Sequence, residues 1–381
     1  MARMDRGNMS PPTETLQRIS RLAPLGELLA RLDAVAPVAA RSMEIAAAVG
    51  ATLAADAVPP EYIPPWAVAI RDGWAVSSDA MQDAGPYAPV PLAQVPAWVE
   101  TGGAMPAGTD AVLPVDAITV TRTGADVLAS VAPGEGVMLA GADAARDAIL
   151  RRAGERLRPS DAAVLLASGI MNVSARLPRV KIFCASVPTR SRADTISPII
   201  ARMIEAEGGL AEVAQAASLE SALLDRACDA IVAIGGTGSG KRDASVKTLA
   251  RVGHVEIHGF GISPGETAAF GTANSHPVLL LPGRLDAALA VFLVAGRGML
   301  KRLAGRSGTD PVIPVKLAKK ATSTVGLAEV VPVRIGEHGA EPLGSGILTL
   351  QALARADGWI LVPPESEGFA AGSLVEMRLL Q

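Results

Sequence analysis

Cysteine, aromatic residues and clustered positive charge are all scarce in this chain. The two cysteines, Cys184 and Cys228, lie in apolar segments and share no metal-ligand spacing with the four histidines, which predicts buried thiols and no Cys/His metal site. Aromatic residues make up only 3% of the chain, so its cores must be built from many small contacts. Lysine and arginine number 35 against 38 acids and meet only in isolated pairs, which argues against a nucleic-acid partner.

Long hydrophobic runs are missing as well. No apolar stretch reaches the roughly 18 residues of a membrane-spanning helix, and the polar N-terminus has no apolar signal core. We therefore expect a cytoplasmic protein that has no membrane segment. The 49% of hydrophobic and 19% of charged residues exclude a disordered chain. A length of 381 residues predicts two to four domains.

The first part of the chain changes character twice. Apolar residues recur at helical spacing over residues 13–32, and a second helix is predicted for residues 42–56. A proline-rich stretch then ends helical structure, and short apolar runs predict a small β-domain over residues 61–140. Ser160 is predicted to cap a following helix. Strands are expected at residues 67–70, 111–114, 118–121 and 127–131.

From residue 179 onward, buried strands alternate with helices. Strands are predicted at residues 179–185 and 230–234 and near Val255 and Val278, and helices at residues 197–207, 218–228, 243–252 and 284–303. This alternation is typical of a parallel sheet with helices on both faces, in which ligands bind beyond the carboxyl ends of the strands. Residues 310–381 hold short β-like runs with glycine turns, which predicts a small C-terminal β-domain.

A glycine-rich loop follows the buried strand at residues 230–234. It reads Gly235-Gly236-Thr237-Gly238-Ser239-Gly240 and leads through Lys241-Arg242 to Asp243 at the expected start of a helix. Glycines allow backbone N–H groups to approach a ligand, and the N-terminus of a helix carries partial positive charge. The pattern therefore predicts a phosphate-binding loop, with a tight turn that binds nothing as the alternative.

The same loop also matches most of the nucleotide-binding P-loop pattern. Gly235, Gly240 and Lys241 have the required spacing. Arg242, however, replaces the Ser or Thr that would hold Mg²⁺, and no acidic strand end completes such a site. A P-loop-like nucleotide-binding protein is therefore an outside alternative.

Eight short motifs follow the order of the MoeA / gephyrin E-domain family, which the chain resembles from about residue 13 to residue 305. The loop is similar to the GGTG-x3-RD form of the adenylyltransferase branch of the MoeA/MogA superfamily, whereas the MoeA branch usually has a serine at the position of Gly238. The other seven are Arg71-Asp72-Gly73-Trp74-Ala75-Val76, Thr101-Gly102-Gly103-Ala104-Met105-Pro106-Ala107-Gly108-Thr109-Asp110-Ala111-Val112, Gly141-Ala142-Asp143, Gly154-Glu155-Arg156-Leu157-Arg158-Pro159, Asp194-Thr195, Ser263-Pro264-Gly265 and Leu281-Pro282-Gly283.

The resemblance implies a multidomain α/β plus β fold and a homodimer. The four implied domains are an α-rich linker domain of residues 13–55 and 140–178, an inserted β-domain of residues 56–139, a MogA-like three-layer α/β/α molybdopterin-binding domain of residues 179–307, and a C-terminal β-barrel of residues 308–381. In such a dimer, Asp72 and Asp143 would approach the loop of the other subunit.

The resemblance also implies molybdenum cofactor biosynthesis. The ligand would be molybdopterin or its adenylylated form, with molybdate and Mg²⁺ as further ligands. Pterin contacts are expected from Gly235, Gly236, Thr237, Gly238, Ser239, Asp194, Ser263, Pro264, Gly265, Pro282 and Gly283. Asp72, Asp143, Asp243 and Arg284 are expected at the reaction centre, with Asp243 capping the next helix and orienting the loop. Taken singly, the acids also fit ordinary turns and helix caps.

The chain departs from the family where molybdate would bind. Both acids of the family's T-G-D-E element are missing near residues 185–188. Ser263 and Glu266 replace two lysines, and Arg284 stands in place of an asparagine. Lysines attract anions most strongly where water is excluded, so their loss disfavours molybdate unless Arg284 or Lys241 compensates.

Two functions therefore stay open within the family. One is an enzyme that inserts molybdate by positioning and charge neutralisation, and the scaffold, intact across two domains, favours it. The other is a non-catalytic carrier of the cofactor, or an assembly partner of a molybdoenzyme, that kept the pterin loop and lost the molybdate site. Arg284 fits either function, because it could bind an oxyanion or simply begin a surface helix.

Overall fold

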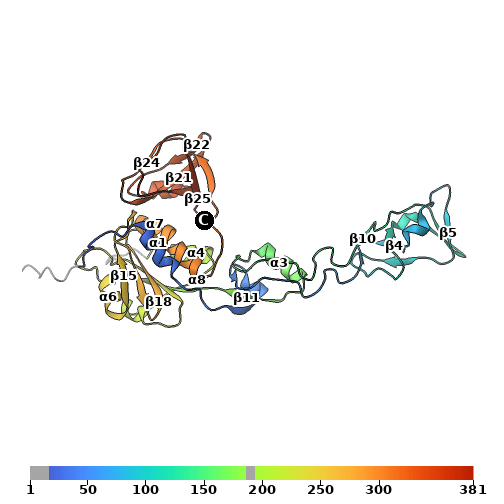
Figure 1. The fold of residues 1–381 in the computed structure, drawn as a ribbon, viewed down its shortest axis with the longest axis horizontal. Helices are drawn as coiled ribbons and strands as arrows, with labels where there is room; N and C mark the ends of the chain where they lie inside the picture. The colour runs from blue at the N-terminus through green and yellow to red at the C-terminus, as the bar shows by residue number, and fades with distance from the viewer. Residues whose placement is uncertain (1–16, 186–193, 381) are drawn as a thin grey trace, which may run out of the picture.

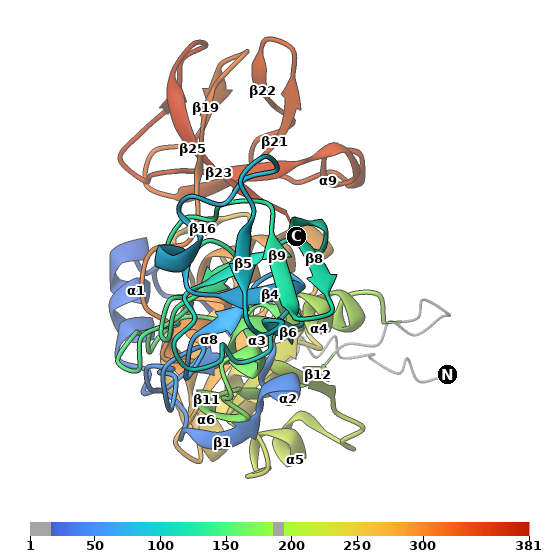
Figure 2. The same cartoon turned by 90° about the vertical axis from the view of Figure 1, so that its right-hand side faces the viewer.

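The computed structural model describes residues 17–185 and 194–380 as an elongated molecule. A layered α/β body that includes α6, β15 and β18 lies at one end (Figure 1). A β-rich arm with β4 and β5 lies at the other end, and β11 and α3 lie between the two. Viewed along the arm, the C-terminal strands stand above the α/β body (Figure 2).

The α/β body is built on a six-stranded sheet in the order β13-β12-β14-β18-β17-β15. Its strands are β12 (Arg179–Cys184), β13 (Leu210–Val213), β14 (Ala230–Ile234), β15 (His254–His258), β17 (Ala269–Ala273) and β18 (His276–Leu281). The first four strands in that order run parallel to one another. The fifth strand, β17, runs antiparallel to both of its neighbours, β18 and β15. The predicted parallel sheet is therefore confirmed, with an antiparallel edge.

Helices cover both faces of this sheet. They are α1 (Leu25–Asp33), α4 (Ser197–Ala206), α5 (Leu219–Leu223), α6 (Ser245–Val252), α7 (Leu285–Val291) and α8 (Arg297–Leu303), with the π-helical turn η4 (Phe292–Gly296) between the last two. Side chains alternate across β14: Val232 and Ile234 join one core, and Ile231 and Ala233 join the other. This alternation is why a fully apolar strand can be buried on both faces, and it confirms the three-layer α/β/α fold.

The middle segment combines a small sheet with two helices. Its elements are β1 (Arg41–Glu44), α2 (Ile45–Ala48), β2 (Thr52–Leu53), α3 (Pro159–Ala167) and β11 (Asn172–Arg176). The sheet order β1-β11-β2 brings together two parts of the chain that the arm separates in sequence. A separate apolar core that includes Ile45, Leu53 and Leu165 holds the segment together.

The arm consists of short strands. They are β3 (Val68–Ala69), β4 (Gly73–Val76), β5 (Val90–Leu92), β6 (Ala97–Val99), β7 (Ala111–Leu113), β8 (Ile118–Thr121), β9 (Gly124–Val127) and β10 (Val137–Met138), with 3₁₀ turns η2 (Ser78–Met81) and η3 (Val115–Ala117). They form the sheets β6-β4-β7, β5-β9-β8 and β10-β3.

The C-terminal strands share their sheet with the α/β body. The elements are β16 (Ile262–Ser263), β19 (Ile313–Lys316), β20 (Ala321–Thr322), β21 (Ala328–Gly336), β22 (Gly339–Pro342), α9 (Leu350–Arg355), β23 (Gly358–Val362), β24 (Gly368–Phe369) and β25 (Leu374–Leu379). The sheet runs β16-β21-β23-β25-β19, so β16 from the α/β body forms one of its edges. The closure of these strands into a barrel stays a prediction.

Several predicted elements are wrong in extent. The helix expected at 13–32 begins only at Leu25, after Pro24, whose missing N–H suits the start of a helix and not its interior. Residues 42–56 form mainly β1, α2 and β2 in place of one helix. The helix expected at 218–228 spans only α5, and the strand expected at 127–131 ends at Val127.

The helix start near residue 160 also needs correction. Arg158 and not Ser160 is the cap of α3, which begins at Pro159. Asp161 accepts the backbone N–H of Arg158 at 2.9 Å and its guanidinium at 2.8 Å. The first turn is therefore held by a carboxylate three residues inside the helix.

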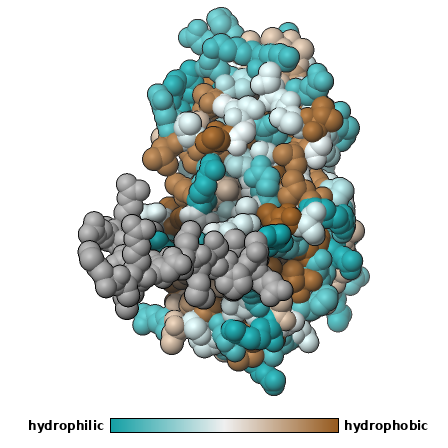
Figure 3. Space-filling model, turned by 90° about the vertical axis from the view of Figure 1, so that its left-hand side faces the viewer, coloured by the Kyte–Doolittle hydropathy of each residue, from teal (hydrophilic) through white to brown (hydrophobic). Residues whose placement is uncertain are grey.

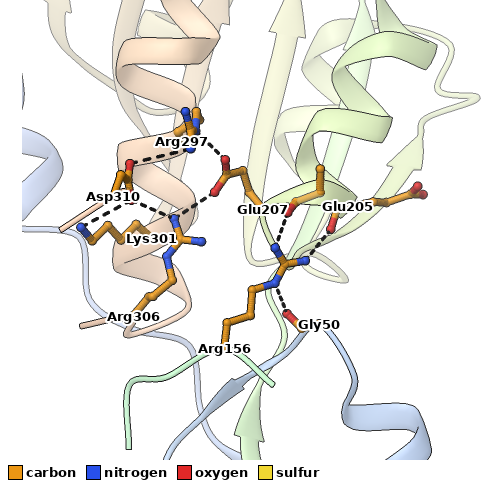
Figure 4. Close-up of polar contacts among 9 residues, drawn as sticks. Gly50, Arg156, Glu205, Glu207, Arg297, Lys301, Arg306 and Asp310 are labelled. Carbon is orange, nitrogen blue, oxygen red and sulfur yellow. Dashed lines mark hydrogen bonds and ion pairs between the residues drawn. The ribbon is translucent and has the colours of Figure 1, made fainter. Parts of the chain in front are cut away.

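Polar contacts join the middle segment to the α/β body (Figure 4). Arg156 donates to the carbonyl oxygens of Gly50 and Glu205, at 2.9 and 3.3 Å, and to that of Ala206. It therefore links the middle segment to the C-terminal turn of α4, where backbone carbonyls lack helical partners. This contact helps fix the direction of the arm.

Ion pairs continue this junction toward the C-terminal strands. Glu207 lies between Arg297 and Arg306, with N–O distances of 2.5 and 2.9 Å, and all three side chains are at least 84% buried. Asp310 adds pairs to Arg306 at 3.4 Å and to Lys301 at 3.7 Å. Figure 4 shows these groups gathered beside α8.

Hydrophobic patches interrupt a largely hydrophilic surface on the end face of the α/β body (Figure 3). Among residues 17–185 and 194–380, no helix is both long enough and apolar enough to cross a membrane.

Candidate functional site

The carboxyl ends of three parallel strands meet at one edge of the α/β sheet. In the strand register, Cys184 pairs with Ile234, and Ile234 pairs with Leu281. The N–H of Ala185 donates to Ile234 at 2.8 Å, and that of Gly235 donates to Leu281 at 2.9 Å. The loops after β12, β14 and β18 therefore start side by side, where ligands bind in such sheets. Residues 186–188, where the T-G-D-E acids are missing, lie outside the described residues.

The loop after β14 is tightly wound against α6. Gly235 and Gly236 have φ angles of +91° and +72°, which disfavour any side chain. Ser245, the first residue of α6, donates its N–H to Gly236 at 2.9 Å and its hydroxyl to Gly235 at 2.7 Å. A Cβ on Gly236 would lie 2.4 Å from that hydroxyl oxygen. These glycines are needed because the backbone of the loop lies close to the first residue of α6.

Asp243 closes the far side of the loop. Its Oδ2 accepts the N–H of Gly240 at 2.8 Å, and a Cβ on Gly238 or Gly240 would meet that oxygen at 2.8 or 2.9 Å. The expected helix cap is wrong, because the cap of α6 is Ala244, which makes no side-chain bond. Asp243 therefore holds the loop and leaves the helix N-terminus uncapped by its carboxylate.

The loop presents backbone donors. Among the described residues, the N–H groups of Gly236, Thr237, Gly238 and Ser239 have no hydrogen-bond acceptor. Thr237 is 1% exposed, and its hydroxyl lies 3.0 Å from the hydroxyl of Thr267, so its side chain faces inward. Unpaired N–H groups beside a helix N-terminus are the features that bind an anion.

Two side chains from outside the βα unit contact the same loop. The amide of Gln17 donates to the carbonyls of Gly236 and Gly238, both at 2.7 Å. His258 Nε2 lies 3.1 Å from the carbonyl of Thr237. The sequence reasoning assigned neither residue to the site. No local pattern marks Gln17, which is 219 residues from Gly236.

Asp194 holds the turn that leads into α4, whose cap is Ile196. Its Oδ1 accepts the N–H groups of Ile196 and Ser197 at 3.1 and 3.0 Å, ahead of α4. Burial by itself would raise the pKa of Asp194, but hydrogen bonds from Ser197 and Ile196 lower that pKa below its ordinary value. The ionised carboxylate of Asp194 is therefore already hydrogen-bonded to the backbone at the start of α4, at the edge of the sheet where the pterin was expected.

The Ser263-Pro264-Gly265 segment begins in β16, at the edge of the C-terminal sheet. Ser263 is 9% exposed and lies in β16 opposite Glu329 of β21. A Cβ on Gly265 would lie 2.4 Å from Val291, so this glycine allows α7 to pack closely. The carboxylate of Glu266 turns back and accepts the N–H of Gly265 at 3.0 Å. Neither Ser263 nor Glu266 supplies the positive charge that the family lysines would.

Arg284 stands at the start of α7, after the buried Pro282 and the exposed Gly283. Its Nη2 lies 2.5 Å and its Nε 3.1 Å from the two carboxylate oxygens of Asp286. The Arg284 side chain is 63% exposed, whereas that of Asp286 is 10% exposed. The guanidinium is therefore at the expected edge of the sheet but already has a counter-ion.

The two acids of the arm and middle segment lie away from the loop of their own chain. Asp72 precedes β4, which Figure 1 shows on the arm, at the opposite end from α6. Its carboxylate accepts the N–H of Thr101 at 2.7 Å, and this bond lowers the pKa of Asp72. Asp143 donates its N–H to Ile63 at 2.9 Å.

The acids expected near a divalent ion are not gathered in one place within the described part of a single chain. The described residues hold no group of three or more His, Cys, Asp or Glu side chains with metal-ligand geometry. Asp243 is already engaged with Gly240.

The P-loop alternative does not fit the observed geometry. In a P-loop, the glycine loop and its Lys-Ser/Thr pair lead directly into the helix. Here α6 begins at Ser245, and both Lys241 and Arg242 are exposed residues that precede it. The sequence departure at Arg242 is therefore matched by a different path of the backbone.

Family models match three consecutive parts of the chain. They describe the MoeA N-terminal region (domain I and II) at residues 12–169, a probable molybdopterin binding domain at residues 170–302 and the MoeA C-terminal region (domain IV) at residues 314–380.

Known proteins show the same similarity. A putative molybdopterin biosynthesis protein of Methanocaldococcus jannaschii is 32% identical over 157 residues, which cover 40% of this chain and 37% of that protein. Molybdopterin molybdenumtransferase 2 of Mycobacterium tuberculosis is 26% identical and covers 86% of this chain and 92% of its own. A crystal structure of a molybdopterin biosynthesis MoeA protein from Pyrococcus horikoshii superposes with a TM-score of 0.73 at 25% identity, over 94% of this chain and 99% of that one.

Proposed function

The chain belongs to the MoeA family of molybdenum cofactor biosynthesis, and from this premise we propose that it binds molybdopterin, or its adenylylated form, at residues 235–240. The observation that carries the proposal is the row of N–H groups on Gly236 to Ser239 that have no acceptor among the described residues, at the carboxyl edge of a parallel sheet. These groups suit the terminal phosphate of the pterin, because backbone N–H groups and the start of α6 both favour negative charge.

The reaction that we propose is insertion of molybdate into the bound pterin. The chain would contribute positioning and charge neutralisation, since both partners are anions. Lys241 is an exposed cation within the loop, and Arg284 lies at the end of the neighbouring strand β18. Relatives that carry the name molybdopterin molybdenumtransferase support this transferase reaction.

A second function has one specific observation in its favour. Arg284 is paired with Asp286, and Ser263 and Glu266 bring no positive charge to the same edge. A protein that keeps the pterin loop but attracts molybdate poorly would act as a carrier of the cofactor or as an assembly partner of a molybdoenzyme. The two functions differ in whether molybdate changes the bound pterin.

We further propose a cytoplasmic homodimer. Asp72 and Asp143 lie away from the loop of their own chain, so they could serve it only from a second subunit. Asp72, Asp143 and Asp243 would then hold Mg²⁺ together, and that ion would help to neutralise the anionic ligands. The proposed domains are residues 13–55 with 140–178, residues 56–139, residues 179–307 and residues 308–381.

A titration of molybdopterin against the wild-type protein and Gly236→Val tests the binding site. The φ of +72° and the nearby Ser245 hydroxyl leave no room for a side chain at Gly236. We expect the wild type to bind and Gly236→Val to lose binding while the C-terminal strands stay folded. Equal affinity in the two proteins would contradict the proposed site.

A further inference from the structure

Gln17 makes an unusual pair of contacts with the glycine loop. Its side-chain nitrogen donates to the carbonyls of both Gly236 and Gly238, at 2.7 Å each, and the residue is 4% exposed. Two carbonyl acceptors can be satisfied only by the NH₂ end of a carboxamide, so the orientation of the side chain is fixed. Its Oε1 is buried and has no hydrogen-bond partner among residues 17–185 and 194–380.

A buried acceptor without a partner is unfavourable, so the stability of the fold alone does not account for the placement of the Gln17 side chain. The rest of its segment is anchored elsewhere: Ala23 exchanges hydrogen bonds with Gly259 and Gly261 at 2.9 and 2.7 Å. Ile19 packs so closely on Gly259 that a Cβ there would lie 2.5 Å from it. The segment is thus fixed to the sheet by its own contacts, and Gln17 extends from it to the loop.

The contacts of Gln17 control where the loop's N–H groups point. In a trans peptide unit, the carbonyl of one residue and the N–H of the next point in opposite directions. The carbonyl of Gly236 shares a unit with the N–H of Thr237, and that of Gly238 shares a unit with the N–H of Ser239. Because both carbonyls converge on one nitrogen of Gln17, these two N–H groups face away from it.

A third carbonyl of the loop is contacted by His258, the last residue of β15. Its Nε2 lies 3.1 Å from the carbonyl of Thr237, which shares its peptide unit with the N–H of Gly238. Three consecutive peptide units therefore have their carbonyls held by side chains. Their three N–H groups are among those without a partner in the described chain.

We propose that Gln17 is a positioning residue for the pterin phosphate: its carboxamide pins two carbonyls of the loop so that the N–H groups of Thr237 and Ser239 face the ligand. This inference rests on the proposed function for the identity of the ligand. The orientation of the loop can be tested without any ligand.

Two substitutions separate positioning from simple packing. Gln17→Glu keeps the shape of the side chain but removes both donors and places a carboxylate against two carbonyl oxygens. Gln17→Leu removes the donors and also the unpaired acceptor. Arg18→Ala, at the exposed neighbouring residue, is the matched control.

The measurements are hydrogen–deuterium exchange of the loop peptide without ligand and equilibrium binding of molybdopterin under anaerobic conditions, at pH 7.5 and 5.0. At pH 7.5 we expect faster exchange and a loss of affinity of about tenfold or more in both variants. At pH 5.0, Gln17→Glu should partly recover relative to the wild type at that pH, because a protonated carboxyl regains one donor. Gln17→Leu should not recover.

The inference would be overturned if both variants showed the hydrogen–deuterium exchange and the molybdopterin affinity of the wild type at pH 7.5. Equal recovery of the Leu and Glu variants at pH 5.0 would also overturn it, since leucine cannot gain a donor. If the wild type binds no molybdopterin while the exchange differences and the pH recovery are seen, the positioning role stands and the proposed function fails.

Discussion

The guanidinium of Arg284 lies 2.5 Å from the carboxylate of Asp286, two residues further along the chain. This pair occupies the edge of the sheet where the family resemblance placed the molybdate site. Asp286 is the buried partner and Arg284 the exposed one. Whether Arg284 can bind an oxyanion therefore depends on whether it can leave Asp286.

Asp286→Asn should release Arg284 and strengthen molybdate-dependent transfer. The change keeps the size of the side chain but removes the competing charge. Arg284→Ala should abolish molybdate-dependent transfer and leave molybdopterin affinity unchanged. Transfer assays and pterin titrations on both variants check this. Unchanged transfer in Arg284→Ala would show that Arg284 has no role in the reaction and only begins α7.

A mixed dimer tests the cleft between two subunits. Asp72→Asn and Gly236→Val should each inactivate the homodimer, the first through the arm and the second through the loop. When the two variants are mixed and allowed to exchange subunits, one cleft of the mixed dimer regains both intact residues. Part of the transfer activity should then return. A mixture that stays inactive, although subunit exchange is shown by labelled chains, would contradict the shared cleft.

Acid should destabilise the middle segment through Asp161. The hydrogen bond from the Arg158 side chain lowers the pKa of Asp161, and its backbone N–H adds to the effect, whereas burial opposes it. A folded-state pKa below the unfolded value means that the stabilisation is present above about pH 3.9 and is lost as the pH falls through the folded pKa.

Denaturant unfolding monitored from pH 7 to pH 2.5 checks this expectation. Asp161→Asn should be less stable than the wild type at pH 7, and the difference should shrink below pH 4. Asp116→Asn, at an exposed residue of the arm, serves as the control. A difference that is independent of pH would contradict the role of the Asp161 charge.

The Arg156 contacts should hold the middle segment to the α/β body. Arg156→Met leaves three carbonyls of Gly50, Glu205 and Ala206 without this donor, which should cost about 1–3 kcal/mol of unfolding free energy. Arg202→Met removes an exposed pair to Glu205 and should cost less than about 1 kcal/mol. Denaturation midpoints compare the two, and X-ray scattering of Arg156→Met should show a broader distribution of molecular lengths. Equal denaturation midpoints for the two variants would show that Arg156 does not hold the middle segment to the α/β body.

Local sequence patterns predicted the core of the site. The strand at residues 230–234 was placed correctly because a short apolar run followed by glycines leaves few other structures. The tight turn of the next loop follows from its glycines, which adopt positive φ angles at Gly235 and Gly236. The family motifs added the order of the domains, which hydrophobic periodicity alone does not determine.

Contacts between distant residues account for what the sequence could not predict. Residues before Pro24 read as a helix, but Ala23 bonds to Gly259 and Gly261 instead. Arg41 pairs with Ala175 across the small sheet, which overrides the helical pattern after residue 42. The pairing of Arg284 with Asp286 was not predicted either, although these residues are only two apart. No residue type near Gln17 indicated that it contacts the loop.

Side-by-side equilibrium titrations of the purified protein with molybdopterin and with Mg-ATP test the central claim most directly. We predict saturable binding of molybdopterin that Gly236→Val removes, and little or no binding of Mg-ATP, which Lys241→Ala leaves unchanged. Tight binding of Mg-ATP that depends on Lys241, or the absence of molybdopterin binding, would contradict the account and show that this chain kept the fold of its family without its ligand.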